Sequence, residues 1–172
     1  MCAKVIITGS IADLPLVNQI KAQMKETVLV SCGFFNIKQL GALAKRVDLF
    51  ITADTGPLHI ANAVGARKII AIFGPTAKEI TGPYPSTNTV VLQKDIGCPI
   101  PCYKVYCKDN RCMKAVTPDD VLAEAKKIDH VVDATPVLTG FGVGTTRLEG
   151  SEKKHGPILL PSIRKVKYLR FN

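Results

Sequence analysis

Short apolar runs recur along the first half of the chain and are separated by segments with helical periodicity. The runs are rich in β-branched residues and span 4–8, 28–32, 47–53, 68–73 and 89–92. Other segments repeat apolar side chains every three to four residues, which predicts helices over 13–25, 36–46, 57–64 and 118–128. Strands that alternate with helices at this spacing form a parallel sheet covered on both faces. The pattern predicts an α/β fold, a Rossmann-like doubly wound parallel sheet.

Capping residues mark the ends of the predicted helices. Asp13 and Asn36 are N-cap candidates for the first two helices, because their side chains can accept from free backbone N–H groups. Gly65 is placed to end the helix over 57–64, and the acidic pair at 119–120 favours the first turn of the last helix. The caps therefore support the element boundaries that the periodicity predicts.

The periodicity ends at about residue 130. Beyond it, glycines at 140, 142 and 144 are followed by Thr, Pro and basic residues without a sustained repeat. Such a segment is typical of a flexible extension. We therefore predict one domain over 1–129 and a flexible basic extension over 130–172.

Composition places the chain among globular proteins, with 47% apolar and 22% charged residues. No run approaches the roughly 20 apolar residues of a membrane-spanning helix, and the first residues do not have the pattern of a secretory signal. We therefore expect a cytoplasmic location and, for most of the six cysteines, reduced thiols.

The net charge of +9 is concentrated at the C-terminal end, where residues 151–172 carry six Lys or Arg against one Glu, or +5. A basic surface attracts nucleic acid, anionic lipid and phosphorylated ligands alike. No nucleic-acid-binding module is recognisable, so no nucleic-acid partner is expected. Ile163, Val166 and Leu169 form a narrow apolar stripe among the cations, which predicts weak peripheral association with an anionic inner-membrane surface. The alternative is a solvated charged tail.

The stretch from Asp48 to Gly65 concentrates polar residues where a buried strand turns into a helix. Ligands of parallel sheets bind at the carboxyl ends of the strands, and a helix that begins there directs free N–H groups at an anion such as a diphosphate. Three features suit this role: Gly56 permits close approach, Pro57 fits the first helical turn, and the helix carries His59 one turn in. The alternative is that Asp54 and Thr55 only cap the helix and His59 is a satisfied, partly buried histidine.

The segment Asp54-Thr-Gly-Pro-Leu-His59, followed by residues 72–76 (Ile-Phe-Gly-Pro-Thr) and then by residues 82–84 (Gly-Pro-Tyr), resembles the signature of glycosyltransferase family nine, the ADP-heptose:lipopolysaccharide heptosyltransferases. In that family the Asp-(Ser/Thr)-Gly segment holds the donor diphosphate on backbone amides, and the Gly-Pro-Thr loop borders the same cleft. The resemblance assigns donor binding to Asp54, Thr55, Gly56, Pro57, Leu58, His59, Gly74, Pro75 and Thr76. It also implies that Thr8, Gly9 and Asp13 touch the donor nucleoside, although Asp13 is equally an N-cap.

The resemblance covers about residues 4–128 and begins at the first strands of the second of two Rossmann-like domains, the GT-B arrangement. It implies that the N-terminal acceptor domain and its acidic catalytic base are absent, so no catalytic residue is assigned in this chain. The implied function is an ADP-heptose-binding domain of a glycosyltransferase of lipopolysaccharide core biosynthesis, incomplete and inactive alone, with no required cofactor. In the intact enzyme the partner substrate would be a lipid-linked saccharide. The alternative is a non-catalytic nucleotide-binding or cysteine-organised interaction module.

Four cysteines cluster in one predicted loop, at Cys98, Cys102, Cys107 and Cys112. Their spacing is close enough for one structural zinc ion, although the usual Cys-x₂-Cys pair is absent. Reduced thiols and disulfides are the alternatives. The loop also resembles a cysteine-rich segment of the second-heptose branch of the family. Cys32 is predicted to be a core residue.

Overall fold

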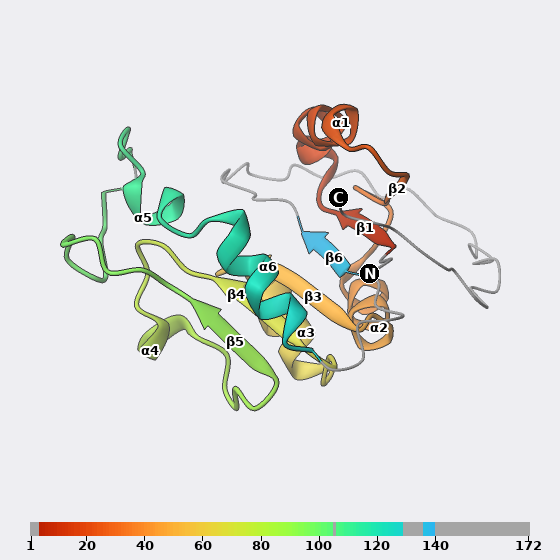
Figure 1. The fold of residues 1–172 in the computed structure, drawn as a ribbon. Coiled ribbons are helices and arrows are strands. Elements are labelled where there is room, and N and C mark those ends of the chain that lie inside the picture. Colours follow the sequence, from red (N-terminus) through yellow and green to blue (C-terminus); the bar gives the residue numbers. More distant parts are fainter. Residues whose placement is uncertain (1–3, 105, 129–135, 140–172) are drawn as a thin grey trace, which may run out of the picture.

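The computed structural model describes residues 4–104, 106–128 and 136–139 (Figure 1). These residues form a six-stranded sheet in which every pairing is parallel, with the strand order β2-β1-β6-β3-β4-β5. The strands are β1 (Val5–Thr8), β2 (Val28–Val30), β3 (Leu49–Ala53), β4 (Ile69–Ile72), β5 (Thr89–Leu92) and β6 (Pro136–Thr139). The first five correspond to the five predicted strands.

β6 lies in a range for which no element was predicted. It occupies the centre of the sheet, with Leu138 in register with Ile7 of β1 on one side and Ile51 of β3 on the other. When β6 is counted as the first strand, the order reads 3-2-1-4-5-6, the usual order of doubly wound sheets. A run of four residues carries too little periodicity to be recognised as a strand. The predicted flexibility of the other residues in 130–172 concerns positions outside the described part of the chain.

Helices cover both faces of the sheet (Figure 1). They are η1 (Ile11–Asp13), α1 (Leu14–Gln23), α2 (Ile37–Arg46), α3 (Gly56–Ala63), α4 (Lys78–Thr81), α5 (Arg111–Lys114) and α6 (Pro118–Lys126). Phe50 of β3 packs under α2 and α3, whereas Leu49 and Ile51 of the same strand pack with residues of α6. This alternation places adjacent side chains of β3 on opposite faces of the sheet. α1 covers β1 and β2.

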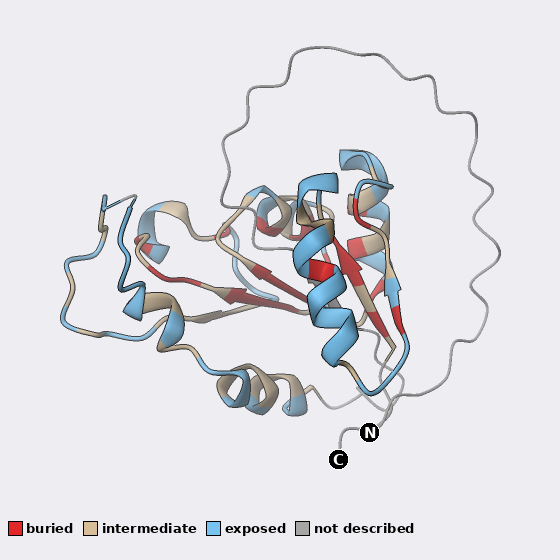
Figure 2. Ribbon diagram, turned by 90° about the horizontal axis from the view of Figure 1, so that it is seen from above, coloured by how far each residue is buried: buried red, intermediate tan, exposed pale blue. Residues whose placement is uncertain are grey.

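Buried residues lie mainly on the strands, and the outer faces of the helices are exposed (Figure 2). β3 and β4 are buried on both faces, as expected for parallel strands between two helical layers. Among the described helices, none is long and apolar enough to cross a membrane.

Capping boxes fix two of the predicted helices. The side chain of Asn36 accepts from the backbone N–H of Gln39 (2.9 Å), and the Gln39 side chain accepts from the Asn36 N–H (3.0 Å). Thr117 and Asp120 form the same reciprocal pair at the start of α6. Each such pair satisfies two N–H groups that the helix itself leaves free. The predicted starts of α2 and α6 are therefore confirmed.

Candidate functional site

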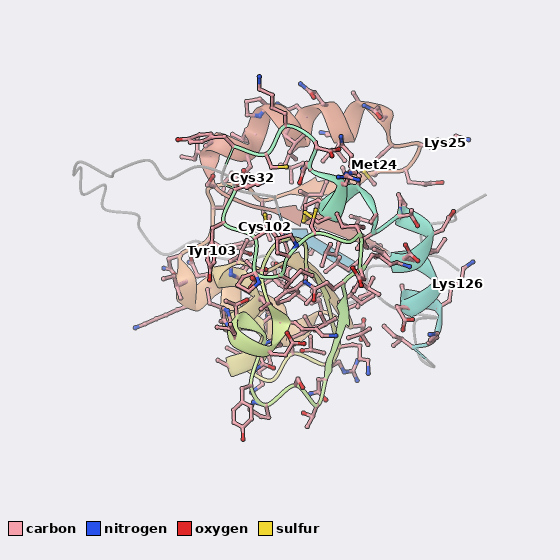
Figure 3. All side chains as sticks on the ribbon, turned by 90° about the vertical axis from the view of Figure 1, so that its left-hand side faces the viewer. Met24, Lys25, Cys32, Cys102, Tyr103 and Lys126 are labelled. Carbon is pink, nitrogen blue, oxygen red and sulfur yellow. The ribbon has the colours of Figure 1, made fainter. Side chains whose placement is uncertain are left out.

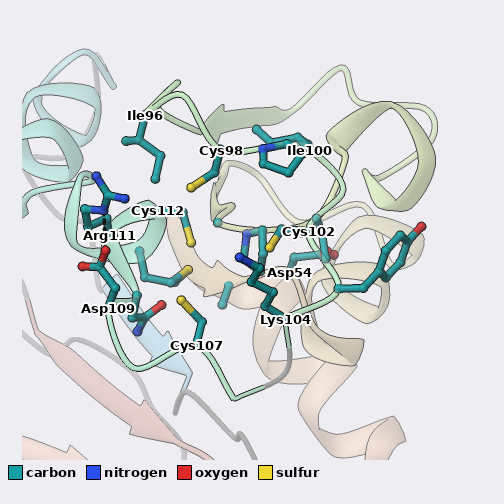
Figure 4. Close-up of a pocket in the computed structure, with 18 of the residues that line it drawn as sticks. Asp54, Ile96, Cys98, Ile100, Cys102, Lys104, Cys107, Asp109, Arg111 and Cys112 are labelled. Carbon is teal, nitrogen blue, oxygen red and sulfur yellow. Dashed lines mark ion pairs between the residues drawn. The ribbon is translucent and has the colours of Figure 1, made fainter.

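A cavity with a volume of about 770 Å³ opens at the carboxyl ends of β3 and β4 (Figure 4). Its walls are the turn after β3, the loop after β4 and the cysteine loop, defined as residues 98–112. Of the residues predicted for the donor site, the cavity is lined by Asp54, Thr55, Gly74, Pro75 and Thr76. The structure thus brings together two predicted segments that lie about 20 residues apart in the sequence, because parallel neighbouring strands end at the same edge.

The amino end of α3 is open toward ligands. Thr55 is the N-cap residue, yet no side chain accepts a hydrogen bond from the first turn of the helix. The Thr55 hydroxyl instead donates to the backbone oxygen of Ala53 (3.4 Å). The Asp54 carboxylate accepts from the hydroxyl of Thr81 in α4 (2.8 Å). The structure therefore does not support the alternative that the side chains of Asp54 and Thr55 only cap the helix.

Thr81 is a site residue that the sequence analysis missed. It directly precedes the Gly-Pro-Tyr motif at 82–84, but its position gives no sign that its hydroxyl reaches a residue 27 positions earlier. α4 holds it there, and the Thr81 hydroxyl also contacts the backbone oxygen of Ala77 (3.2 Å). The hydrogen bond fixes the Asp54 carboxylate at the cavity wall.

The loop after β4 is held from two sides. The side-chain amide of Gln93 donates to the backbone oxygens of Gly74 (3.1 Å) and Thr76 (2.7 Å). The backbone N–H of Cys102 donates to the oxygen of Pro75 (2.7 Å). A Cβ atom on Gly74 would collide with the Met113 side chain, which would have to shift, so glycine at this position lets Met113 and Cys112 pack closely against the strand end. Packing within the protein therefore accounts for this glycine.

The four clustered cysteines all line the cavity, and the cysteine loop faces the viewer in Figure 3, where Cys102 is labelled. Their thiols are free. Within the described residues, no three His, Cys, Asp or Glu side chains are grouped so that they could hold a metal ion. The loop spreads the four sulfur atoms around the cavity wall, so the structure does not assemble the predicted zinc site.

Gly56, Pro57, Leu58 and His59 do not line the cavity. Leu58 is fully buried and belongs to the core beneath α3, so it cannot contact a ligand directly. His59 is exposed, because one residue along a helix turns the side chain by about 100° from the buried Leu58. His59 is thus outside the cavity lining, although the family resemblance assigns it to donor binding. Gly56 is exposed, and nothing lies within 4 Å of a Cβ atom built on it.

Thr8, Gly9 and Asp13 also lie outside the cavity. The Asp13 carboxylate accepts from the backbone N–H (2.7 Å) and the hydroxyl (2.8 Å) of Ser10 in a capping box around η1. Asp13 occupies the N-cap position of α1, as predicted, but its side chain makes no hydrogen bond to that helix. Thr8 is buried, and Gly9 lies against the Asp13 side chain. Local hydrogen bonds and packing therefore occupy these residues.

Cys32 is a core residue, as predicted. It is 3% exposed and packs with Val5, Val17 and Val28. Burial raises the pKa of the Cys32 thiol, and the nearby Asp13 carboxylate adds to the rise. A thiol with a raised pKa is mostly protonated at neutral pH and unreactive.

The model of glycosyltransferase family 9 (heptosyltransferase) matches residues 3–111. Lipooligosaccharide heptosyltransferase 2 of Campylobacter jejuni subsp. jejuni serotype O:6 is 38% identical over 122 residues, which cover 68% of this chain and 38% of that protein. Lipopolysaccharide core heptosyltransferase OpsX of Haemophilus influenzae is 30% identical over 125 residues, covering 67% of this chain and 35% of that protein. The chain thus spans less than two fifths of the length of these relatives.

The crystal structure of the glycosyl transferase family 9 from Veillonella parvula DSM 2008 matches this structure with a TM-score of 0.64 at 26% identity. The match covers 73% of this chain and 36% of that one. Together with the parallel sheet and its two helical layers, it confirms the predicted Rossmann-like α/β fold. The family match includes the strands, the turn and the loop that build most of the cavity. The chain belongs to glycosyltransferase family 9, the heptosyltransferases.

Proposed function

We propose that this chain is the donor-binding domain of a heptosyltransferase of lipopolysaccharide core biosynthesis, and that an ADP-heptose-like sugar nucleotide binds in the cavity at the carboxyl ends of β3 and β4. The position of Thr55 carries the proposal, because this N-cap residue of α3 lines the cavity and its side chain makes no capping hydrogen bond to the helix. The positive end of the helix dipole favours an anion beside Thr55, and a diphosphate has the required charge. Membership of the family supports the choice of a sugar nucleotide.

The same arrangement suits the chemistry of glycosyl transfer. When a sugar leaves a nucleoside diphosphate, negative charge grows on the departing phosphate oxygens. Fixed backbone dipoles at the start of α3 would stabilise that charge without reorganising. Asp54, held by Thr81, would stand beside the same ligand and is suited to accept hydrogen bonds from sugar hydroxyls.

We also propose that this chain of 172 residues binds the donor but does not transfer the sugar. Transfer needs a base that removes a proton from the acceptor hydroxyl. Both carboxylates of the cavity are engaged: Asp54 accepts from Thr81, and Asp109 pairs with Arg111 (2.5 Å). The acceptor, a lipid-linked saccharide, would be bound by parts that the relatives have beyond the matched range.

Calorimetry with ADP, an ADP-sugar and a UDP-sugar tests the proposal, with a radiolabelled ADP-sugar and a lipid-linked saccharide acceptor run in parallel. We expect weak binding of ADP and the ADP-sugar, weaker binding of the UDP-sugar, and no transfer. Transfer by this chain alone would disprove the binding-only part. Absence of nucleotide binding would reject the donor site and favour the cysteine-organised interaction module.

A further inference from the structure

Four charged side chains line the cavity: Asp54, Lys104, Asp109 and Arg111. Arg111 pairs with Asp109 (2.5 Å), and Asp54 accepts from Thr81 (2.8 Å). Among the described residues, the Lys104 ammonium group has no hydrogen bond and no ion pair. Of the four charged side chains, Lys104 is therefore the one without a hydrogen bond or an ion pair in the described part of the chain.

The cysteine loop holds Lys104 at the cavity. Two residues before it, the backbone N–H of Cys102 is bonded to the oxygen of Pro75 (2.7 Å) on the cavity wall. Three residues after it, the N–H of Cys107 donates to the Lys104 backbone oxygen (3.2 Å), which closes a turn. Two residues span at most about 7 Å, so this anchor keeps the Lys104 backbone close to the wall. In Figure 4 its side chain lies among the cavity residues, with Cys102 and Asp54 as labelled neighbours.

The charge balance at the cavity calls for such a cation. The amino end of a helix contributes about half a positive charge. A nucleoside diphosphate carries two or more negative charges, and the Asp54 carboxylate adds another at the same wall. An ammonium group in the lining offsets this excess and forms charge-assisted hydrogen bonds to phosphate oxygens.

We propose that Lys104 binds the diphosphate of the donor, so that the cysteine loop supplies the cation of the donor site. The inference rests on the proposed donor-binding function. It gives the cysteine loop a role in ligand binding: the contacts of Cys102 and Met113 with the loop after β4 hold Lys104 in the lining that also includes Thr55.

The test compares Lys104→Gln with Lys108→Gln, because Lys108 is an exposed lysine of the same loop that does not line the cavity. Affinities for ADP and for adenosine are measured by calorimetry on the full chain, at low and at high KCl concentration. We expect Lys104→Gln to lower the ADP affinity about tenfold or more and to leave the adenosine affinity unchanged. Lys108→Gln should match the wild type for both ligands. Lys104→Arg should recover part of the loss.

The salt series gives an independent readout. Raising KCl should weaken ADP binding more in the wild type than in Lys104→Gln, because the variant has lost a screened charge contact. Equal ADP affinities of the wild type and Lys104→Gln would overturn the inference while leaving the donor site standing. Equal losses for ADP and adenosine would also overturn it, because they would indicate a damaged fold. A wild-type chain that binds no ADP would remove the proposed function and this inference with it.

Discussion

Two strand–loop–helix units at the carboxyl edge of the sheet look alike in the sequence but differ in the structure. After β1, Asp13 is used within the loop, where its carboxylate accepts from the N–H and the hydroxyl of Ser10. After β3, Asp54 is drawn away from its own helix by Thr81, and the start of α3 has no side-chain cap. Neither α1 nor α3 has a side-chain cap, but the turn after β1 is closed by a local capping box, whereas the turn after β3 lines a cavity.

The surfaces around the two units differ as well. The turn after β3 is covered by the cysteine loop, which encloses a polar and apolar cavity. The turn after β1 carries Ile11, which is 70% exposed and lies against Gly33, and the segment after β2 adds the exposed Phe34 and Ile37. We therefore expect the residues that pack over a turn to decide whether that turn can bind a ligand.

Gly56→Val should have the largest effect on ligand binding. A side chain at Gly56 meets open space in the protein, so the fold is kept, but we expect it to obstruct phosphates bound beside the neighbouring Thr55, which lines the cavity. We expect the ADP affinity to fall about a hundredfold or more in calorimetry. Ala63→Val, at the other end of α3, is the control and should bind ADP as the wild type does. Unaltered ADP affinity in Gly56→Val would show that the open end of α3 is not the anion site.

Gly74→Ala should destabilise the β3–β4 unit. The added methyl group collides with Met113, and overpacking of this kind costs about 1–3 kcal/mol of unfolding free energy. Denaturant unfolding measures the loss, and ADP binding should weaken as the cysteine loop shifts. The double variant Gly74→Ala with Met113→Ala should recover stability relative to Gly74→Ala, because the smaller side chain leaves room for the methyl group. A double variant no more stable than Gly74→Ala would contradict this packing.

Asp13→Ala should affect stability without affecting nucleotide binding. The variant loses the capping box of η1, which costs about 1 kcal/mol, and Ser10→Ala should show a similar loss in thermal unfolding. Its ADP affinity should equal that of the wild type, because Asp13 lies outside the cavity. A marked drop in ADP affinity would instead support the nucleoside contact that the family resemblance implies.

Asp120→Asn should have the smallest effect, and only above acidic pH. The Lys94 ammonium group, together with the backbone N–H and hydroxyl of Thr117, lowers the pKa of Asp120 from 3.8 to about 2. Because the folded-state pKa is depressed, the carboxylate adds stability at pH values above about 4, and this contribution is lost as the pH falls toward 2. Melting temperatures of the wild type and the variant should differ slightly at pH 6 and converge near pH 2. A constant difference over this range would rule out the ionised carboxylate as its source.

The local pattern of the sequence predicted most of the layered fold. The five apolar runs are strands, and Asn36 and Thr117 start α2 and α6 through contacts within three residues. Such features are set by neighbouring side chains and by backbone N–H groups that need partners, so they can be recognised without knowing what packs above them. The turn after β3 and the loop after β4 were likewise recognisable from their residues.

Only the tertiary structure decided which of these residues face the ligand cavity. Thr81 reaches Asp54 from 27 residues away, Cys102 anchors its loop to Pro75, and β6 enters the sheet between β1 and β3, more than 80 residues from each. The sequence around each of these residues shows no pattern that identifies the residue it contacts in the fold. The sequence by itself determined the strands, the helix starts and the polar turn, because these depend on local hydrogen bonding and burial. The open end of α3, the central strand and the unpaired Lys104 depend on long-range packing, which only the folded chain defines.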